Sequence, residues 1–133
     1  MGYTHYWKGI ANLDVILKDQ LNRLIEYGVW NHVLEQEDYE SDVDIYAHVS
    51  LENKEVCFNG IEDEGHETFC VTFNQSFEFS FCKTARKPYD EYVVAALILI
   101  TEANARTGGN FSWSSDGDEP DFVEGRKLAD QFR

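Results

Sequence analysis

The chain has 133 residues, of which 43% are hydrophobic and 14% aromatic, enough apolar material for the core of one compact domain over residues 1–133. Its 25 acidic side chains outnumber 11 Lys and Arg, and the formal net charge is −14. This excess of negative charge argues against direct binding to nucleic acid or to an anionic membrane surface, because both need a surplus of cations. The longest apolar run, Val93–Ile100, is too short to span a bilayer.

The N-terminal half combines one helical pattern with several strand patterns. Alternating aromatic residues predict a strand over Gly2–Trp7. Leucines at helical spacing predict an amphipathic helix that begins at an Asn12 N-cap, reaches Tyr27 and is ended by Gly28. Patterns of period two then predict four strands joined by short turns, as in an antiparallel meander, over residues 45–51, 56–58, 66–74 and 77–82.

The C-terminal half is mainly helical. A helix is predicted from Pro88 to about Ala105, apolar over a wide arc and ended by a glycine pair at 108–109. A short strand over 111–114 follows, and Pro120 opens a last helix, whose inward-facing residues are Phe122, Ala129 and Phe132. The expected fold class is therefore α+β: an antiparallel sheet of four to six strands, with two long helices and one short helix packed on one face.

The three cysteines fall on three different predicted strands. Cys57, Cys70 and Cys82 form no Cys-x-x-Cys pair, and an odd count favours reduced thiols over a disulfide framework. Together with His66 they are ligand types that zinc prefers, but their spacing is poor for a zinc site. We therefore expect no metal site and no cofactor. The N-terminus lacks the pattern of a signal peptide, which together with the reduced thiols predicts a cytoplasmic location.

Five short motifs are spread over most of the chain. They are GYTHYW (residues 2–7), FNG (58–60), HETF (66–69), FCKTARKPYD (81–90) and SSDG (114–117). This set resembles a family of small uncharacterised proteins of tailed bacteriophages, prophages and bacteria. The resemblance implies a phage accessory protein that acts in the host bacterial cell, and it implies no particular activity.

Negative charge is concentrated between Glu35 and Glu67. This stretch holds 12 acids and one cation, Lys54, a local net charge of −11. Dense like charge is typical of a solvated surface, but on a rigid sheet it can also compete for a basic groove that holds nucleic acid. Exposed aromatic residues such as Tyr39, Tyr46 and Trp30 would supply anchoring contacts.

The leading hypothesis is therefore a non-enzymatic phage inhibitor of a host defence system, anti-CRISPR or similar. It would bind a basic nucleic-acid-binding host protein, such as a nuclease or a CRISPR effector, through this acidic face; a homodimer is left open. The predicted partner-binding residues are Glu35, Glu37, Asp38, Glu40, Asp42, Glu62, Asp63 and Glu64.

A basic loop over residues 83–87 supports an alternative. It leads into a predicted helix N-terminus, whose free N–H groups favour an anion, although its cations can equally pair with surrounding acids. The alternative is a protein that binds or cleaves a nucleotide signal. Its predicted ligand residues are His5, Tyr6, His66, Lys83, Thr84, Arg86, Tyr89 and Asp116. Because no catalytic motif such as Gly-x-Ser-x-Gly is present, we assign no catalytic residue and expect a binding protein rather than an enzyme.

Overall fold

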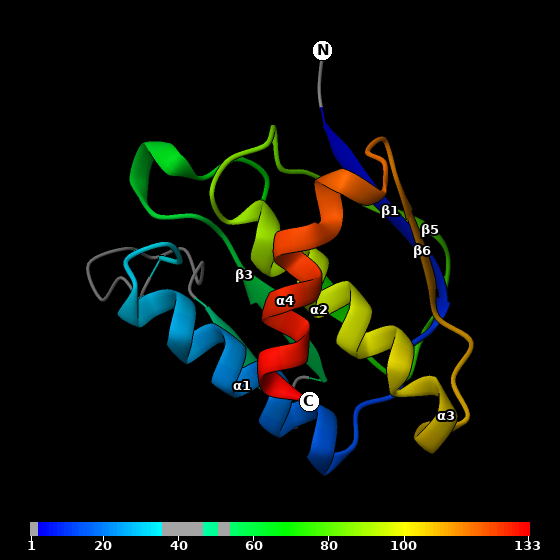
Figure 1. The fold of residues 1–133 in the computed structure, drawn as a ribbon. Coiled ribbons are helices and arrows are strands. Elements are labelled where there is room, and N and C mark those ends of the chain that lie inside the picture. The colour runs from blue at the N-terminus through cyan, green and yellow to red at the C-terminus, as the bar shows by residue number, and fades with distance from the viewer. Residues whose placement is uncertain (1–2, 36–46, 51–53) are drawn as a thin grey trace, which may run out of the picture.

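A computed structural model of the chain describes residues 3–35, 47–50 and 54–133 (Figure 1). All six predicted strands are present among the described residues, and several of their boundaries there differ by a few residues; positions 2, 45–46 and 51 of the predicted strands lie outside the described residues. In chain order the strands and helices are β1 (Thr4–Ile10), α1 (Val15–Trp30), β2 (His48–Ser50), β3 (Glu55–Phe58), η1 (Glu62–Glu64), β4 (Phe69–Thr72), β5 (Ser76–Lys83), α2 (Asp90–Glu102), α3 (Asn104–Thr107), β6 (Ser112–Ser115), η2 (Glu119–Phe122) and α4 (Val123–Phe132).

The strands form two antiparallel sheets rather than one. The first sheet has the order β5-β1-β6 and the second has the order β2-β3-β4. The prediction of a single sheet of four to six strands is wrong because β5 leaves the meander after β4. At this point Phe73 N donates a hydrogen bond to Lys54 O. The next residue, Asn74, has a φ of 63°, and its N donates to Ala11 O. The bend turns the chain out of the second sheet, and β5 pairs with β1 instead.

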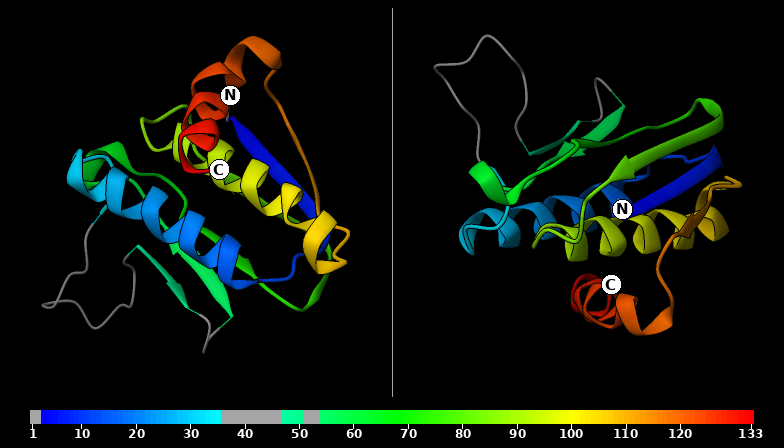
Figure 2. Two further views of the ribbon diagram at one scale, coloured as in Figure 1. Left: turned by 60° about the horizontal axis from the view of Figure 1, so that its bottom comes forward. Right: turned by 90° about the horizontal axis from the view of Figure 1, so that it is seen from above.

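The helices form two layers beneath the sheets (Figure 2). α1 and α2 lie side by side against the sheets, whereas α4 packs on the far side of α2. The helices therefore lie on one side of the sheets, as expected, but α4 packs on the other helices and not on a sheet. Since α2 has neighbours on both sides, it is buried all round, from Tyr92 to Ile100. The inward orientation predicted for Phe122, Ala129 and Phe132 is confirmed, because all three are buried.

Some helix boundaries differ from the prediction. The helix expected from Pro88 begins at Asp90, and it ends at Glu102, with the short α3 after it. The glycine stop is confirmed, since Gly108 caps α3 with a φ of 75° in the left-handed region. Among the described residues, none of the helices combines the length and the apolar character that a membrane span requires.

The first helix is capped by Asp14, not by Asn12, and it runs to Trp30, past the stop predicted at Gly28, which lies buried inside the helix. Asp14 Oδ1 accepts a hydrogen bond of 2.7 Å from Leu17 N, and Arg106 from α3 donates to the same carboxylate at 2.9 Å. Asn12 instead donates from its side chain to Thr107 O. The guanidinium of Arg106 and the backbone N–H of Leu17 hold the pKa of Asp14 below its usual range, although burial opposes them. The cap therefore also ties the start of α1 to α3.

We expect Asp14→Ala to lower the free energy of unfolding by about 1 kcal/mol at neutral pH, the usual effect of losing an N-cap. Because the pKa of Asp14 is lowered in the folded state, its contribution is present above the pKa of the unfolded chain and is lost as the pH falls through the folded value. Urea unfolding at neutral and acidic pH measures this. Asp19→Ala, which breaks an exposed ion pair with Arg23 in the same helix, is the control and should change little. An equal loss at both positions would contradict the capping role.

Two of the three cysteines are joined. Cys57 on β3 and Cys70 on β4 are paired in the sheet register with a Cα–Cα distance of 4.2 Å, and they form a disulfide. The expectation of three reduced thiols is therefore wrong: strand register, which the residue count does not contain, brings these two sulfurs together. Cys82 is a free thiol buried in the first sheet, and burial raises its pKa to about 12.

Candidate functional site

The loop over residues 83–87, predicted to bind a nucleotide, contributes Thr84 to a buried polar cluster with His5 and Asp90. Oδ1 of Asp90, at the start of α2, lies 2.6 Å from His5 Nε2 and accepts a hydrogen bond of 2.5 Å from Thr84 Oγ1. His5 and Thr84 are fully buried, and the Asp90 side chain is only 12% exposed. These groups satisfy one another beneath the surface, so they stabilise the junction of β1, the loop and α2.

The cations of this loop lie around the cluster. The guanidinium of Arg86 lies 4.0 Å from the centre of the Tyr3 ring, and its Nη1 is 3.1 Å from Asp121 Oδ1. The hydrogen bond to Asp121 raises the pKa of Arg86. Lys83 is half-buried and donates from its backbone N to the Glu67 carboxylate at 2.6 Å. Arg86 therefore joins the loop to η2 through an ion pair and contacts Tyr3, just before β1, through a cation–π interaction.

The remaining predicted ligand residues are dispersed. Tyr89 is fully buried, and its hydroxyl donates to Glu67 O at 2.6 Å; burial raises its pKa. Tyr6 donates from its hydroxyl to Asp116 Oδ1 at 3.0 Å on the surface, and this hydrogen bond raises the pKa of Tyr6. His66 is exposed in the turn before β4. The eight residues thus occupy the buried core, the sheet surface and a separate turn, and they do not converge on one pocket.

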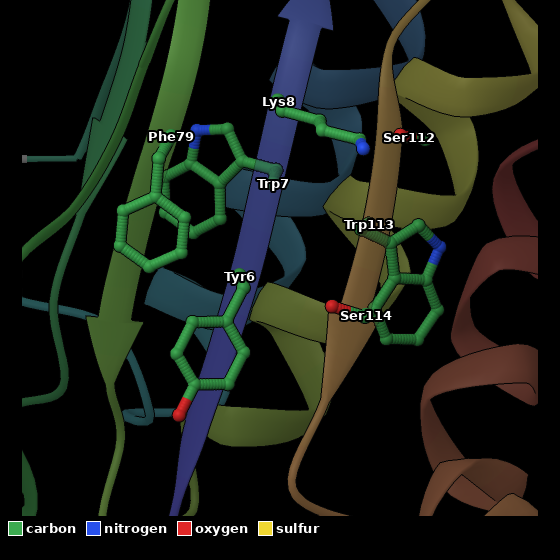
Figure 3. A pocket seen from close by; sticks show the side chains of 7 residues that line it. All are labelled: Tyr6, Trp7, Lys8, Phe79, Ser112, Trp113 and Ser114. Carbon is green, nitrogen blue, oxygen red and sulfur yellow. The ribbon is translucent and has the colours of Figure 1, made fainter.

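A pocket lies on the outer face of the first sheet, with a volume of about 360 Å³ (Figure 3). Of the predicted ligand residues its lining includes only Tyr6, whose ring centre lies 5.7 Å from that of Phe79. Phe79 and Phe81 are 61% and 52% exposed, while Cys82 on the opposite face of β5 is buried. The pocket is lined by Tyr6, Trp7, Lys8, Phe79, Ser112, Trp113 and Ser114.

Four of the eight predicted partner-binding residues lie within the described residues, and they lie close together. Glu35 follows an isolated bridge between Leu34 and Gly60, and η1 comes directly after that bridge. Glu35 N donates to Asn59 O, and the Glu35 carboxylate accepts a hydrogen bond of 3.1 Å from Glu62 N. We call this group the acidic turn; its members are Glu35, Glu62, Asp63 and Glu64.

The backbone holds the acidic turn tightly. Gly60 packs against the turn so closely that a Cβ at this position would lie 2.4 Å from Glu64 O. The three residues of η1 are exposed, and Glu62 has a φ of 48°. Among the described residues, no ion pair includes a member of the acidic turn. Negative charge is therefore displayed to solvent on a fixed backbone.

An exposed tryptophan lies at the same end of the molecule. Trp30 is the last residue of α1 and is 82% exposed. The end of α1 is adjacent to η1 in both views of Figure 2, and Ile61 N donates to Val33 O just beyond Trp30. Sequence reasoning identified both features, but their proximity depends on the bridge at Leu34. The other predicted partner-binding residues, Glu37, Asp38, Glu40 and Asp42, lie outside the described residues, as do Tyr39 and Tyr46.

Comparisons with known protein families, curated proteins and solved structures found no match to this chain. The class of protein is therefore defined by its own fold and surface: an α+β domain whose described surface combines an acidic turn with an exposed tryptophan.

Proposed function

We propose that this protein is a non-enzymatic binding protein whose acidic turn and Trp30 contact a basic partner. In the phage setting that the motifs suggest, the partner is a nucleic-acid-binding host defence protein, such as a nuclease or a CRISPR effector, and binding blocks its basic groove. The observation that carries the proposal is that α1 ends, at the 82% exposed Trp30, next to η1, where four carboxylates have no ion-pair partner among the described residues (Figure 2).

The two features would have different roles in binding. An exposed tryptophan offers a large apolar surface, and tryptophan is enriched among the few residues that dominate the free energy of protein–protein association. The carboxylates of the acidic turn attract a positively charged surface and increase the rate of association, an effect that salt screens. The combination favours a protein partner, since nucleic acid would be repelled by the same carboxylates.

We expect Trp30→Ala to weaken partner binding by about thirtyfold or more, which corresponds to the loss of roughly 2 kcal/mol at a dominant contact. Glu62→Gln, Asp63→Asn and Glu64→Gln combined should slow association and reduce its salt dependence. The measurement is retention of host proteins on the immobilised full-length chain at two salt concentrations, followed by binding kinetics with the purified partner.

Two control variants match these changes. Phe81→Ala removes an aromatic side chain that is 52% exposed on the first sheet. Glu119→Gln, Glu124→Gln and Asp130→Asn remove three exposed negative charges from η2 and α4. Both controls should bind as the unchanged protein does. If no basic host protein is retained at low salt, or if the controls weaken binding as much as the test variants, the proposal is wrong.

A further inference from the structure

The outer face of the second sheet carries a row of potential metal ligands. Strand register places His48 on β2 opposite Cys57 on β3, and Cys57 opposite Cys70 on β4. Glu55 lies on the same face of β3 as Cys57, two residues earlier. Imidazole, thiolate and carboxylate are the three ligand types that Zn²⁺ takes from proteins. The row therefore contains four ligands of the right chemistry on three neighbouring strands.

The distances fit a tetrahedral ion. His48 Nε2 lies 3.3 Å from Glu55 Oε1, and Cys57 Sγ lies 3.5 Å from Glu55 Oε2. Ligand atoms of His48, Glu55 and Cys57 are all within 4.8 Å of one another. Zn²⁺ with bonds of about 2.0–2.3 Å holds its tetrahedral ligand atoms roughly 3.3–3.7 Å apart. Three of the four ligands thus need only small side-chain movements to surround an ion.

The fourth ligand is Cys70, which the disulfide now joins to Cys57. Once the bond is broken, the two sulfurs are free to separate to about 3.7 Å, the spacing of two thiolates on one Zn²⁺. An ion can reach the site from solvent, because Cys70 is exposed and the side chains of His48 and Glu55 are 21% and 32% exposed.

We infer that His48, Glu55, Cys57 and Cys70 form a Zn²⁺ site that exists only when the Cys57–Cys70 disulfide is reduced. A dithiol reductant transfers two electrons and two protons to the disulfide, leaves two cysteine thiols and becomes a disulfide itself. Zn²⁺ then replaces the two thiol protons, which pass to solvent, and binds both thiolates together with the His48 imidazole and the Glu55 carboxylate. The second sheet is cross-linked by a disulfide under oxidising conditions and by the metal under reducing conditions.

These four ligands differ from the three cysteines and His66 that the sequence analysis considered as zinc ligands. Cys57 and Cys70 belong to both sets, but Cys82 is buried in the first sheet and His66 is in an exposed turn. His48 and Glu55 enter only through strand register. Cys82 and His66 therefore provide matched controls, one for each ligand type.

Titration of the reduced, metal-free full-length chain with Co²⁺ tests the site, since Co²⁺ replaces Zn²⁺ and reports thiolate ligands by a charge-transfer band. We expect one Co²⁺ per chain, a thiolate charge-transfer band, displacement by Zn²⁺ and a higher melting temperature with metal. The oxidised chain should show no such band. His48→Gln and Cys70→Ser should each weaken binding by about a hundredfold or more, because even groups that only support a ligand contribute ten- to a hundredfold. Cys70→Ser should also reduce the charge-transfer intensity by about half.

The control variants His66→Gln and Cys82→Ser should bind Co²⁺ as the unchanged chain does. Circular dichroism of each variant shows whether it is folded, and His48→Gln retains both cysteines in case a serine variant does not fold. The inference is overturned if the reduced chain gives no thiolate band, if the oxidised chain binds Co²⁺ equally well, or if His66→Gln weakens binding as much as His48→Gln.

Discussion

Replacing Asp90 with alanine is expected to lower the free energy of unfolding by about 3–5 kcal/mol, the usual effect of removing one partner from a buried polar pair. The carboxylate bonds to both His5 Nε2 and Thr84 Oγ1, and His5 and Thr84 are fully buried. Without Asp90 both groups lose this partner while they stay buried, and an unsatisfied buried polar group destabilises the folded state. His5 Nδ1 already lacks a hydrogen-bond partner among the described residues, so the imidazole would have none at either nitrogen.

Urea unfolding of Asp90→Ala and Asp90→Asn measures this effect. Asparagine retains a side-chain oxygen at the same place, so we expect it to destabilise less than alanine does. Glu124→Ala is the control, since Glu124 lies in the first turn of α4 and its ion pair with Lys127 is exposed. The control should change the free energy of unfolding by about 0.5 kcal/mol or less. A loss at Asp90 no larger than that at Glu124 would show that the buried cluster does not stabilise the fold.

The second large effect is expected at Phe69, which connects the two sheets. Phe69 is fully buried on β4; its ring centre lies 5.0 Å from that of Phe58 on β3 and 5.3 Å from that of Trp7 on β1. Phe69→Ala removes the ring between the sheets and leaves a cavity. We expect it to lower the free energy of unfolding by about 3–5 kcal/mol, as usual for a buried phenylalanine.

Phe81→Ala is the matched comparison for Phe69→Ala, because it removes the same side chain from a position that is 52% exposed. It should change stability by about 0.5 kcal/mol or less. Phe69→Leu fills most of the cavity and should fall between the two alanine variants. Both free energies come from urea unfolding of the full-length chain. If Phe69→Ala proves as stable as Phe81→Ala, the two sheets do not share this packing.

The candidate site could be predicted in part. The charge count alone located the acidic stretch, because local composition determines charge density, and Trp30 was named separately as an aromatic anchor. The proximity of Trp30 to η1 required a backbone bridge between Leu34 and Gly60, a contact between residues far apart in the chain. The nucleotide residues were grouped on the expectation that distant positions such as His5 and His66 converge with the loop over residues 83–87, yet Tyr89 is buried and His66 lies in another turn. Neighbours in sequence do not determine on which side of a strand or helix each side chain lies.

The sequence by itself determined the elements of this protein, since strand alternation, helical spacing and the stop at Gly108 are local patterns that depend on local sterics and hydrogen bonding, whereas Gly28 lies inside α1. Only the tertiary structure decided how those elements combine. The bend at Asn74 moved β5 to the first sheet, where the Phe79 and Phe81 face is exposed and the Cys82 face is buried. Strand register joined Cys57 to Cys70 and brought His48 beside them. These outcomes depend on long-range pairing, in which each strand takes the partner and the face that bury the most apolar surface, and no local pattern contains that choice.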